Sequence, residues 1–90
     1  MTNEPVRDVQ IRVTGHVQGV GFRVGARHRA RELGVHLHAE NQPDGSVLLE
    51  AKGNADAVER LVVWAKQGPR NARVDHVEVT NRDAGADGFA

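Results

Sequence analysis

The sequence predicts an α+β sandwich in which two helices lie on one face of a mostly antiparallel sheet. Four segments alternate apolar and polar residues with a period of two, which is typical of strands with one buried face. Two longer segments repeat apolar residues at helical spacing, giving the order strand, helix, strand, strand, helix, strand. Ninety residues suit one small domain, so residues 1–90 are assigned to a single domain.

The first strand and the first helix enclose a glycine-rich loop. Residues 9–13 place valine or isoleucine at every second position, and we expect this strand to end where the glycines begin, at Gly15. The apolar stripe of the helix that follows consists of Phe22, Ala26, Ala30 and Leu33. Gly34 is a natural stop for this helix. Gly25 predicts close packing of the helix on the sheet.

A hairpin and a second helix come next. Residues 35–52 alternate on both sides of a Pro-Asp-Gly turn sequence at 43–45, which predicts two strands joined by a turn. Asn54 is suited to cap the second helix. The apolar stripe of that helix consists of Val58, Leu61, Val62 and Ala65. Gly68-Pro69 ends it.

The last strand is marked by Val77 and Val79. Val74 is out of phase with them, which predicts either a bulge or a late start of the strand. The two ends of the chain, residues 1–6 and 81–90, are weakly determined by the sequence pattern.

Twelve basic and twelve acidic side chains cancel, but the N-terminal third is basic. Residues 1–34 contain six arginines against three carboxylates, which suits a small anionic ligand. A nucleic-acid interface needs a broader basic face and more aromatic side chains than the three present. The absence of cysteine excludes disulfides and thiolate chemistry, and no apolar run suits a signal peptide or a membrane span. We therefore expect a soluble cytoplasmic protein with no nucleic-acid and no membrane partner.

The stretch 15–23, Gly-His-Val-Gln-Gly-Val-Gly-Phe-Arg, has the composition of an anion-binding loop. Its glycines permit positive φ and close approach of the backbone to a ligand. The loop opens onto a helix N-terminus, where unpaired N–H groups and the helix dipole attract anions. Arg23 adds a planar charged group that can hold two phosphate oxygens. The residues predict a phosphate cradle without the Lys-Ser continuation and clustered carboxylates of a nucleotide–magnesium site.

This loop resembles a signature of the acylphosphatase family. Residues 15–23 match G-x-V-Q-G-V-x-F-R at every fixed position. Asn41, followed by Asp-Gly-Ser-Val at 44–47 and by Gly53, matches the second signature. The resemblance covers roughly residues 8–80 and implies a ferredoxin-like βαββαβ fold.

The chain departs from the family pattern near the second signature and at its end. Leu37 and His38 stand where the family usually has a glycine and an aromatic residue. Glu40 stands where a basic or neutral residue is common, and its carboxylate weakens substrate binding unless strand alternation points it away. The chain stops at Gly88-Phe89-Ala90, where the family's closing strand runs on, which puts the last strand in question.

The resemblance implies a hydrolase that splits the carboxyl–phosphate bond of small acyl phosphates into carboxylate and inorganic phosphate. The phosphoryl oxygens would be bound by the backbone N–H groups of Val17, Gln18, Gly19, Val20, Gly21 and Phe22. The catalytic side chains would be Arg23, which neutralises phosphoryl charge, and Asn41, whose amide orients the attacking water. The same resemblance implies no metal, no other cofactor and no phosphoenzyme, and we expect a monomer.

Other interpretations of these residues stay open. A fold with this phosphate cradle also suits a non-catalytic anion-binding module. His36 and His38, with Glu40 next along the same strand face, have a metal-ligand spacing, although such groups are more often unliganded. Acylphosphatase-like modules also occur inside larger hydrogenase-maturation proteins, a context that the short chain argues against. A solvated face, or alternatively anion steering, is assigned to three arginines of the first helix: Arg27, Arg29 and Arg31.

Overall fold

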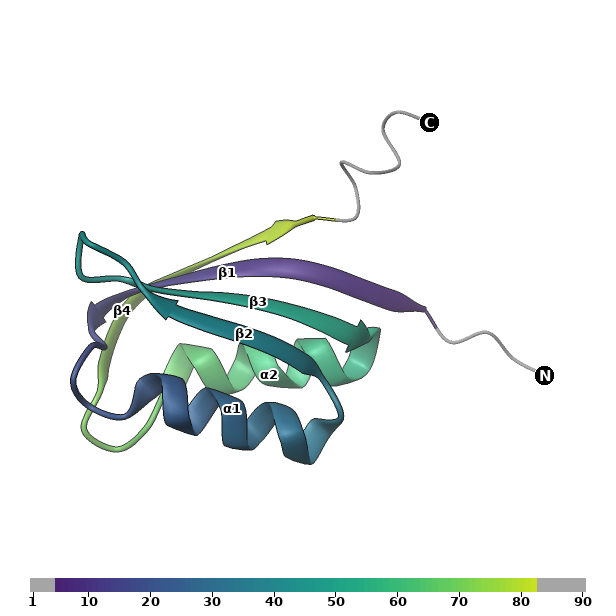
Figure 1. Ribbon diagram of the computed structural model, residues 1–90, viewed down its shortest axis with the longest axis horizontal. Helices are drawn as coiled ribbons and strands as arrows, with labels where there is room; N and C mark the ends of the chain where they lie inside the picture. Colours follow the sequence, from purple (N-terminus) through teal and green to yellow (C-terminus); the bar gives the residue numbers. More distant parts are fainter. Residues whose placement is uncertain (1–4, 83–90) are drawn as a thin grey trace.

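Four strands form one sheet, and two helices cover one of its faces (Figure 1). The computed structural model describes residues 5–82. In chain order the elements are β1 (Val6–His16), α1 (Phe22–Leu33), β2 (His36–Asn41), β3 (Val47–Asn54), α2 (Ala55–Gln67) and β4 (Arg73–Asn81). The strand order is β2-β3-β1-β4, and all three neighbouring pairs are antiparallel. The predicted α+β class and ferredoxin-like βαββαβ arrangement are confirmed.

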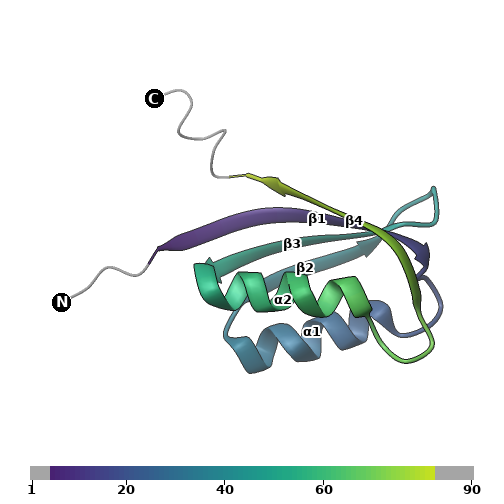
Figure 2. The same cartoon turned by 180° about the vertical axis from the view of Figure 1, so that it is seen from behind.

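The strand directions bring two distant segments to the same end of the sheet. β1 and β2 both run antiparallel to β3, which lies between them, so β1 and β2 run in the same direction. The loop after β1 and the turn after β2 therefore emerge together, beside the start of α1. Figure 2 shows the two helices side by side under the sheet and the loop ends gathered at one end.

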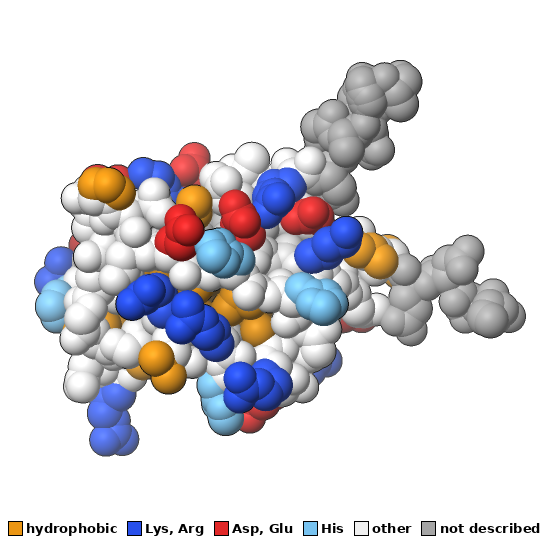
Figure 3. All heavy atoms as spheres, viewed as in Figure 1, with side chains coloured by type: hydrophobic (Ala, Val, Ile, Leu, Met, Phe, Trp, Pro, Cys, Tyr) orange, Lys and Arg blue, Asp and Glu red, His pale blue; other side chains and the backbone are white. Residues whose placement is uncertain are grey.

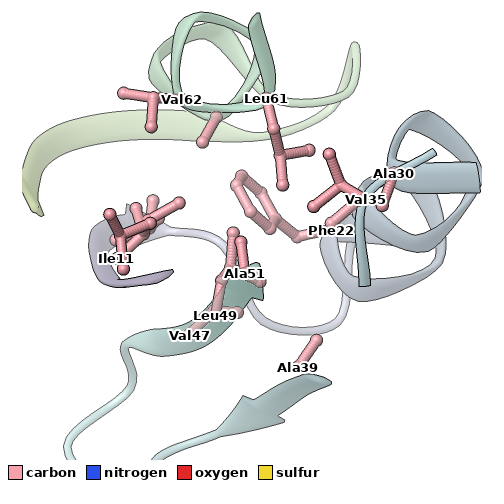
Figure 4. Packing of buried hydrophobic residues seen from close by; sticks show 14 of the residues in the cluster. Ile11, Phe22, Ala30, Val35, Ala39, Val47, Leu49, Ala51, Leu61 and Val62 are labelled. Carbon is pink, nitrogen blue, oxygen red and sulfur yellow. The ribbon is translucent and has the colours of Figure 1, made fainter. Parts of the chain in front are cut away.

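The core between sheet and helices is almost entirely aliphatic (Figure 4). Ile11 on the central strand and Leu49 on its neighbour are fully buried and face each other across the β1–β3 pair. Phe22, the first residue of α1, is 1% exposed and points into this core. Its ring meets that of Trp64 on α2 with 5.2 Å between centroids and an angle of 56°. Phe22 thus anchors the start of α1, as predicted.

Gly25 serves packing between the two helices and not, as predicted, packing of a helix on the sheet. A Cβ atom at this position would lie 2.9 Å from Cζ2 of Trp64 on α2. The prediction was wrong because the period of the helix fixes which side a residue occupies, but not which neighbour covers that side.

β1 continues through Gly15 to His16, so the strand does not end at Gly15 as predicted. β4 holds this extension in the sheet, with the bulge that the phase of Val74 suggested. Thr14 pairs with His76 and the next residue pairs with Val74, which leaves Asp75 as the extra residue. Gly15 has φ 130°, and a Cβ there would overlap the carbonyl oxygen of Arg73. Glycine is therefore required here by the close approach of β4, and the predicted anion-binding loop begins after it.

We expect Gly15→Ala to lower the free energy of unfolding by about 3 kcal/mol, because overpacking and backbone strain each cost roughly 1–3 kcal/mol. Urea unfolding of the purified variant measures the loss. Gly34→Ala is the matched control: Gly34 also has positive φ, 73°, but a Cβ there meets nothing within 4 Å. Its cost should be only about 1 kcal/mol. Equal losses in the two variants would show that the contact with Arg73 is unimportant.

The predicted helix ends are confirmed. Gly34 ends α1 in the left-handed conformation, and Gly68 follows the last residue of α2. Asn54 caps α2, because its Oδ1 accepts hydrogen bonds from the N–H groups of Asp56 (2.9 Å) and Ala57 (3.4 Å). Within the part of the chain that the structure describes, neither helix is long and apolar enough to cross a membrane. The sequence also put the last strand in question because of the chain end at Gly88-Phe89-Ala90, and these three residues lie outside those that the structure describes.

Candidate active site

The loop between β1 and α1 exposes backbone donors. Gly19 and Gly21 both adopt the left-handed conformation, with φ of 76° and 83°. Gly21 is the N-cap of α1, yet no side chain caps this helix and its first turn contains no acidic residue. The N–H groups at the start of a helix have no intrahelical partner, and the positive end of the dipole lies there. The loop therefore presents N–H groups and positive potential to whatever occupies the space in front of it.

That space is a pocket of about 110 Å³ at the N-terminus of α1. We call it the loop pocket, and its lining residues are Val17, Gly19, Gly21, Phe22, Arg23, Val24 and Asn41. Six of the eight predicted site residues thus lie around one space, including both predicted catalytic side chains. Pockets for drug-sized ligands usually measure roughly 300–1,000 Å³. The loop pocket is therefore suited to a small group such as a phosphoryl group.

Two of the predicted residues, Gln18 and Val20, do not line this pocket. Val20 is half-buried and packs against the core. The side chain of Gln18 turns to the β2–β3 connection, where its Nε2 donates to the carbonyl oxygens of Gln42 (2.8 Å) and Ser46 (2.9 Å). A side-chain contribution of either residue to ligand binding is not seen, so any role in the pocket falls to their backbone N–H groups.

The Gln18 bridge is a feature that the sequence analysis missed. It ties the glycine loop to the turn that directly follows Asn41. The Ser46 carbonyl also accepts the Gln42 N–H at 2.8 Å, so one oxygen joins both segments. No local pattern marks this contact, because its partners are backbone carbonyls 24 and 28 residues away. The only sequence signal for this contact was Gln18 itself, because it occupies a fixed position of the signature and its side chain had no assigned role.

Asp44 stabilises the turn between β2 and β3 through hydrogen bonds within the turn. Its carboxylate accepts hydrogen bonds from the Ser46 hydroxyl (2.6 Å) and the Ser46 N–H (2.9 Å), and it pairs with Arg12 at 2.8 Å. The Ser46 hydroxyl, followed by the Ser46 N–H and Arg12, lowers the pKa of the Asp44 carboxyl. A lowered folded-state pKa means that this carboxylate stabilises the fold above its unfolded pKa. That contribution is lost as the pH falls through the folded pKa.

We expect Ser46→Ala to raise the pKa of Asp44 toward the ordinary value of about 3.9, because the main donor to the carboxylate is removed. Carboxyl-carbon NMR titration of parent and variant measures the shift. Asp75 is the internal control: its pKa is lowered by Arg73 at a distant site and should be the same in both proteins. An unchanged Asp44 pKa would mean that the hydroxyl does not support the turn.

Strand alternation directs Asn41 toward the loop and Glu40 away from it. Ala39, two residues before Asn41, is buried on the helix-covered face of β2, whereas Glu40 is exposed on the open face. There the Glu40 carboxylate lies 3.0 Å from Nε2 of His38, and this hydrogen bond lowers the pKa of Glu40. The carboxylate that appeared in the sequence as a possible obstacle therefore points away from the loop pocket.

His36 and His38 share the open face of the sheet, as their spacing predicted. Within residues 5–82, no three His, Cys, Asp or Glu side chains are grouped in a way that could hold a metal ion. The metal-binding interpretation of these residues therefore finds no support in the described structure.

Comparison with known protein families matches residues 9–90 to the family described as Acylphosphatase. The chain belongs to the acylphosphatase family. It is 53% identical over 81 residues to an acylphosphatase from Salinibacter ruber, a match that covers 90% of this chain and 84% of that protein. An acylphosphatase from Thermus thermophilus is 50% identical over 78 residues, covering 86% of this chain and 89% of that protein.

A solved acylphosphatase structure has the same fold. The structure of an acylphosphatase from Coxiella burnetii superposes with a TM-score of 0.83 at 34% identity, covering 90% of this chain and 87% of that one. As an acylphosphatase, the protein hydrolyses acyl phosphates, so the predicted enzyme class and substrate class are confirmed.

Proposed function

We propose that the loop pocket is the catalytic site, in which the backbone N–H groups of 17–22 and the Arg23 guanidinium hold the phosphoryl group while Asn41 orients water. One observation carries this proposal: Arg23 and Asn41, 18 positions apart in the sequence, line the same small pocket at the uncapped start of α1. The N–H groups and the guanidinium are donors, so they favour the negative charge of phosphoryl oxygens.

The reaction needs little covalent chemistry from the protein. The water oxygen attacks phosphorus, the bond from phosphorus to the acyl oxygen breaks, and its electron pair leaves with the carboxylate. The water proton passes to solvent or to the phosphate product. Carboxylate is a good leaving group, so catalysis rests on positioning and on charge stabilisation. Arg23 and the loop N–H groups supply the charge stabilisation in this proposal.

A neutral amide fits the second role. Asn41 accepts a hydrogen bond from water through its oxygen and donates one through its NH₂ group, without repelling the phosphoryl group. Glu40 faces the open side of the sheet, so no carboxylate of β2 opposes substrate in the pocket. A non-catalytic anion-binding module would need no amide beside its phosphate cradle, which favours the enzyme interpretation of Asn41.

The proposal extends to a metal-independent monomer of one domain that acts in the cytoplasm. Both proposed catalytic side chains, Arg23 and Asn41, line one pocket of the same chain, which supports the monomer. The sequence contains no cysteine, which suits a reducing compartment without requiring one.

Steady-state hydrolysis of acetyl phosphate tests the proposed function. We expect turnover that is unchanged by EDTA, and competitive inhibition by inorganic phosphate because phosphate occupies the same N–H cradle. Loss of activity on chelation would refute the metal-independent mechanism. Non-competitive inhibition by phosphate would place the anion elsewhere than the loop pocket.

A further inference from the structure

Three arginines lie along one side of α1. Arg23, Arg27 and Arg31 follow each other at intervals of four residues, a spacing that stacks side chains on one helix face. Arg27 and Arg31 line a groove of about 300 Å³, so this face of α1 is turned toward β2. We call it the α1–β2 groove, and its lining residues are Arg27, Ala30, Arg31, Val35, His36 and Leu37. Figure 3 shows basic side chains over α1 beside a hollow with hydrophobic side chains at its floor.

The positive charge along this groove is not neutralised within the fold. Among residues 5–82, no carboxylate forms an ion pair with Arg27 or Arg31. By contrast, Arg29 pairs with Glu32 at 3.0 Å. Helical geometry places Arg29 on a different side of α1 from Arg27. When an anion binds an unpaired arginine at the edge of a groove, no existing ion pair has to be broken.

The groove and the loop pocket share no lining residue, but their nearest arginines are neighbours on the surface of α1. Arg23 lines the loop pocket, and Arg27 lies one helical turn further on, about 6 Å along the axis. Val24 also lines the loop pocket, is 68% exposed, and lies three residues before Arg27 on the helix surface. A ligand whose phosphoryl group occupies the loop pocket can therefore lay a short apolar segment past Val24 and reach Arg27 with its far end.

We propose that Arg27, at the end of the α1–β2 groove nearest the loop pocket, binds the far end of the acyl group and favours acyl groups that carry a second anionic group, such as those of short dicarboxylic acids. This inference rests on the proposed function of the loop pocket. Val24 supplies apolar surface for the methylenes, and Arg27 supplies charge for the terminal carboxylate, with Arg31 one helical turn further on.

Two acyl phosphates of equal carbon count test the proposal. Succinyl phosphate carries a terminal carboxylate where butyryl phosphate carries a methyl group, so the ratio of their kcat/KM values isolates the second charge. We expect a ratio of about 5 in the parent at low salt, because exposed ion pairs contribute roughly 0.2–1 kcal/mol each, about 1.4–5-fold. Arg27→Gln should lower the ratio about threefold, and Arg27→Gln with Arg31→Gln should bring it close to one. High salt should lower the parent ratio in the same direction.

Arg29→Gln is the matched control, since it removes the same charge from another side of the same helix. Its ratio should equal that of the parent. A parent ratio near one would overturn the proposed binding of the second anionic group. An equal fall in the Arg27 and Arg29 variants would also overturn it, because the overall charge of α1 would then explain the preference. Acetyl phosphate is assayed alongside: turnover of acetyl phosphate with a ratio near one refutes the groove alone. Absence of acetyl phosphate turnover refutes the proposed function, and the groove with it.

Discussion

Arg23→Ala is expected to lower kcat/KM for acetyl phosphate by at least about 1,000-fold, roughly 4 kcal/mol of transition-state stabilisation. The reason is that the variant loses the one permanently charged side chain that, among the described residues, lines the loop pocket. Affinity for inorganic phosphate should fall in parallel, because in the proposed mechanism the same guanidinium contacts the ground-state anion. Steady-state kinetics with phosphate as a competitive inhibitor measures both quantities.

Two further variants separate charge from folding. Arg23→Lys keeps the charge but loses the planar, two-pronged geometry, so its kcat/KM should lie between those of the parent and the alanine variant. Arg23 is exposed, and surface substitutions usually change stability by less than about 0.5 kcal/mol, so Arg23→Ala should unfold at nearly the parent urea midpoint. Parent-like kinetics in a folded Arg23→Ala protein would remove this residue from the mechanism.

Asn41→Ala is expected to lower kcat by about 100-fold or more while changing the inhibition constant of phosphate less than about threefold. In the proposed mechanism the amide positions water and so acts on the reaction step, whereas the loop and Arg23 hold the phosphoryl group without it. The two constants come from one set of progress curves at several phosphate concentrations.

The carboxylate variant is a sharper test than alanine alone. Asn41→Asp keeps an acceptor for water but places negative charge beside the phosphoryl group, so phosphate affinity should fall together with kcat. Asn71→Ala, at an exposed position between α2 and β4, is the control for replacing an asparagine. If Asn41→Ala weakened phosphate binding as strongly as it slowed turnover, Asn41 would be a binding group and the water would need another partner.

The order of the elements could be predicted because each one follows from local periodicity. The alternation at 9–13 and 35–52 and the helical stripes describe faces that the sheet and helices bury together. The end of β1 was predicted too early because glycine is a weak strand former, and only pairing with β4 keeps Gly15 in the strand. The prediction that Gly25 packs on the sheet was wrong for a similar reason, because tertiary packing decides which surface covers each side of a helix.

The location of the candidate site residues followed from sequence only where they form a contiguous signature. Residues 17–23 occupy one loop and one helix start, so their common location was predictable, and Asn41 came from the family resemblance. The Gln18 bridge, the position of Val24 at the loop pocket and the α1–β2 groove were not predicted. Each depends on the distance between segments that are remote in sequence, and this distance is set by the parallel course of β1 and β2.

The Gln18 bridge also bears on the entropy of binding. A loop held to the Asn41 turn by two hydrogen bonds has already lost much of its conformational freedom when substrate arrives. Its ordering is therefore part of folding, and association does not have to supply that free energy a second time. The loop is in this sense pre-organised, and we expect that binding of phosphate does not require it to become ordered.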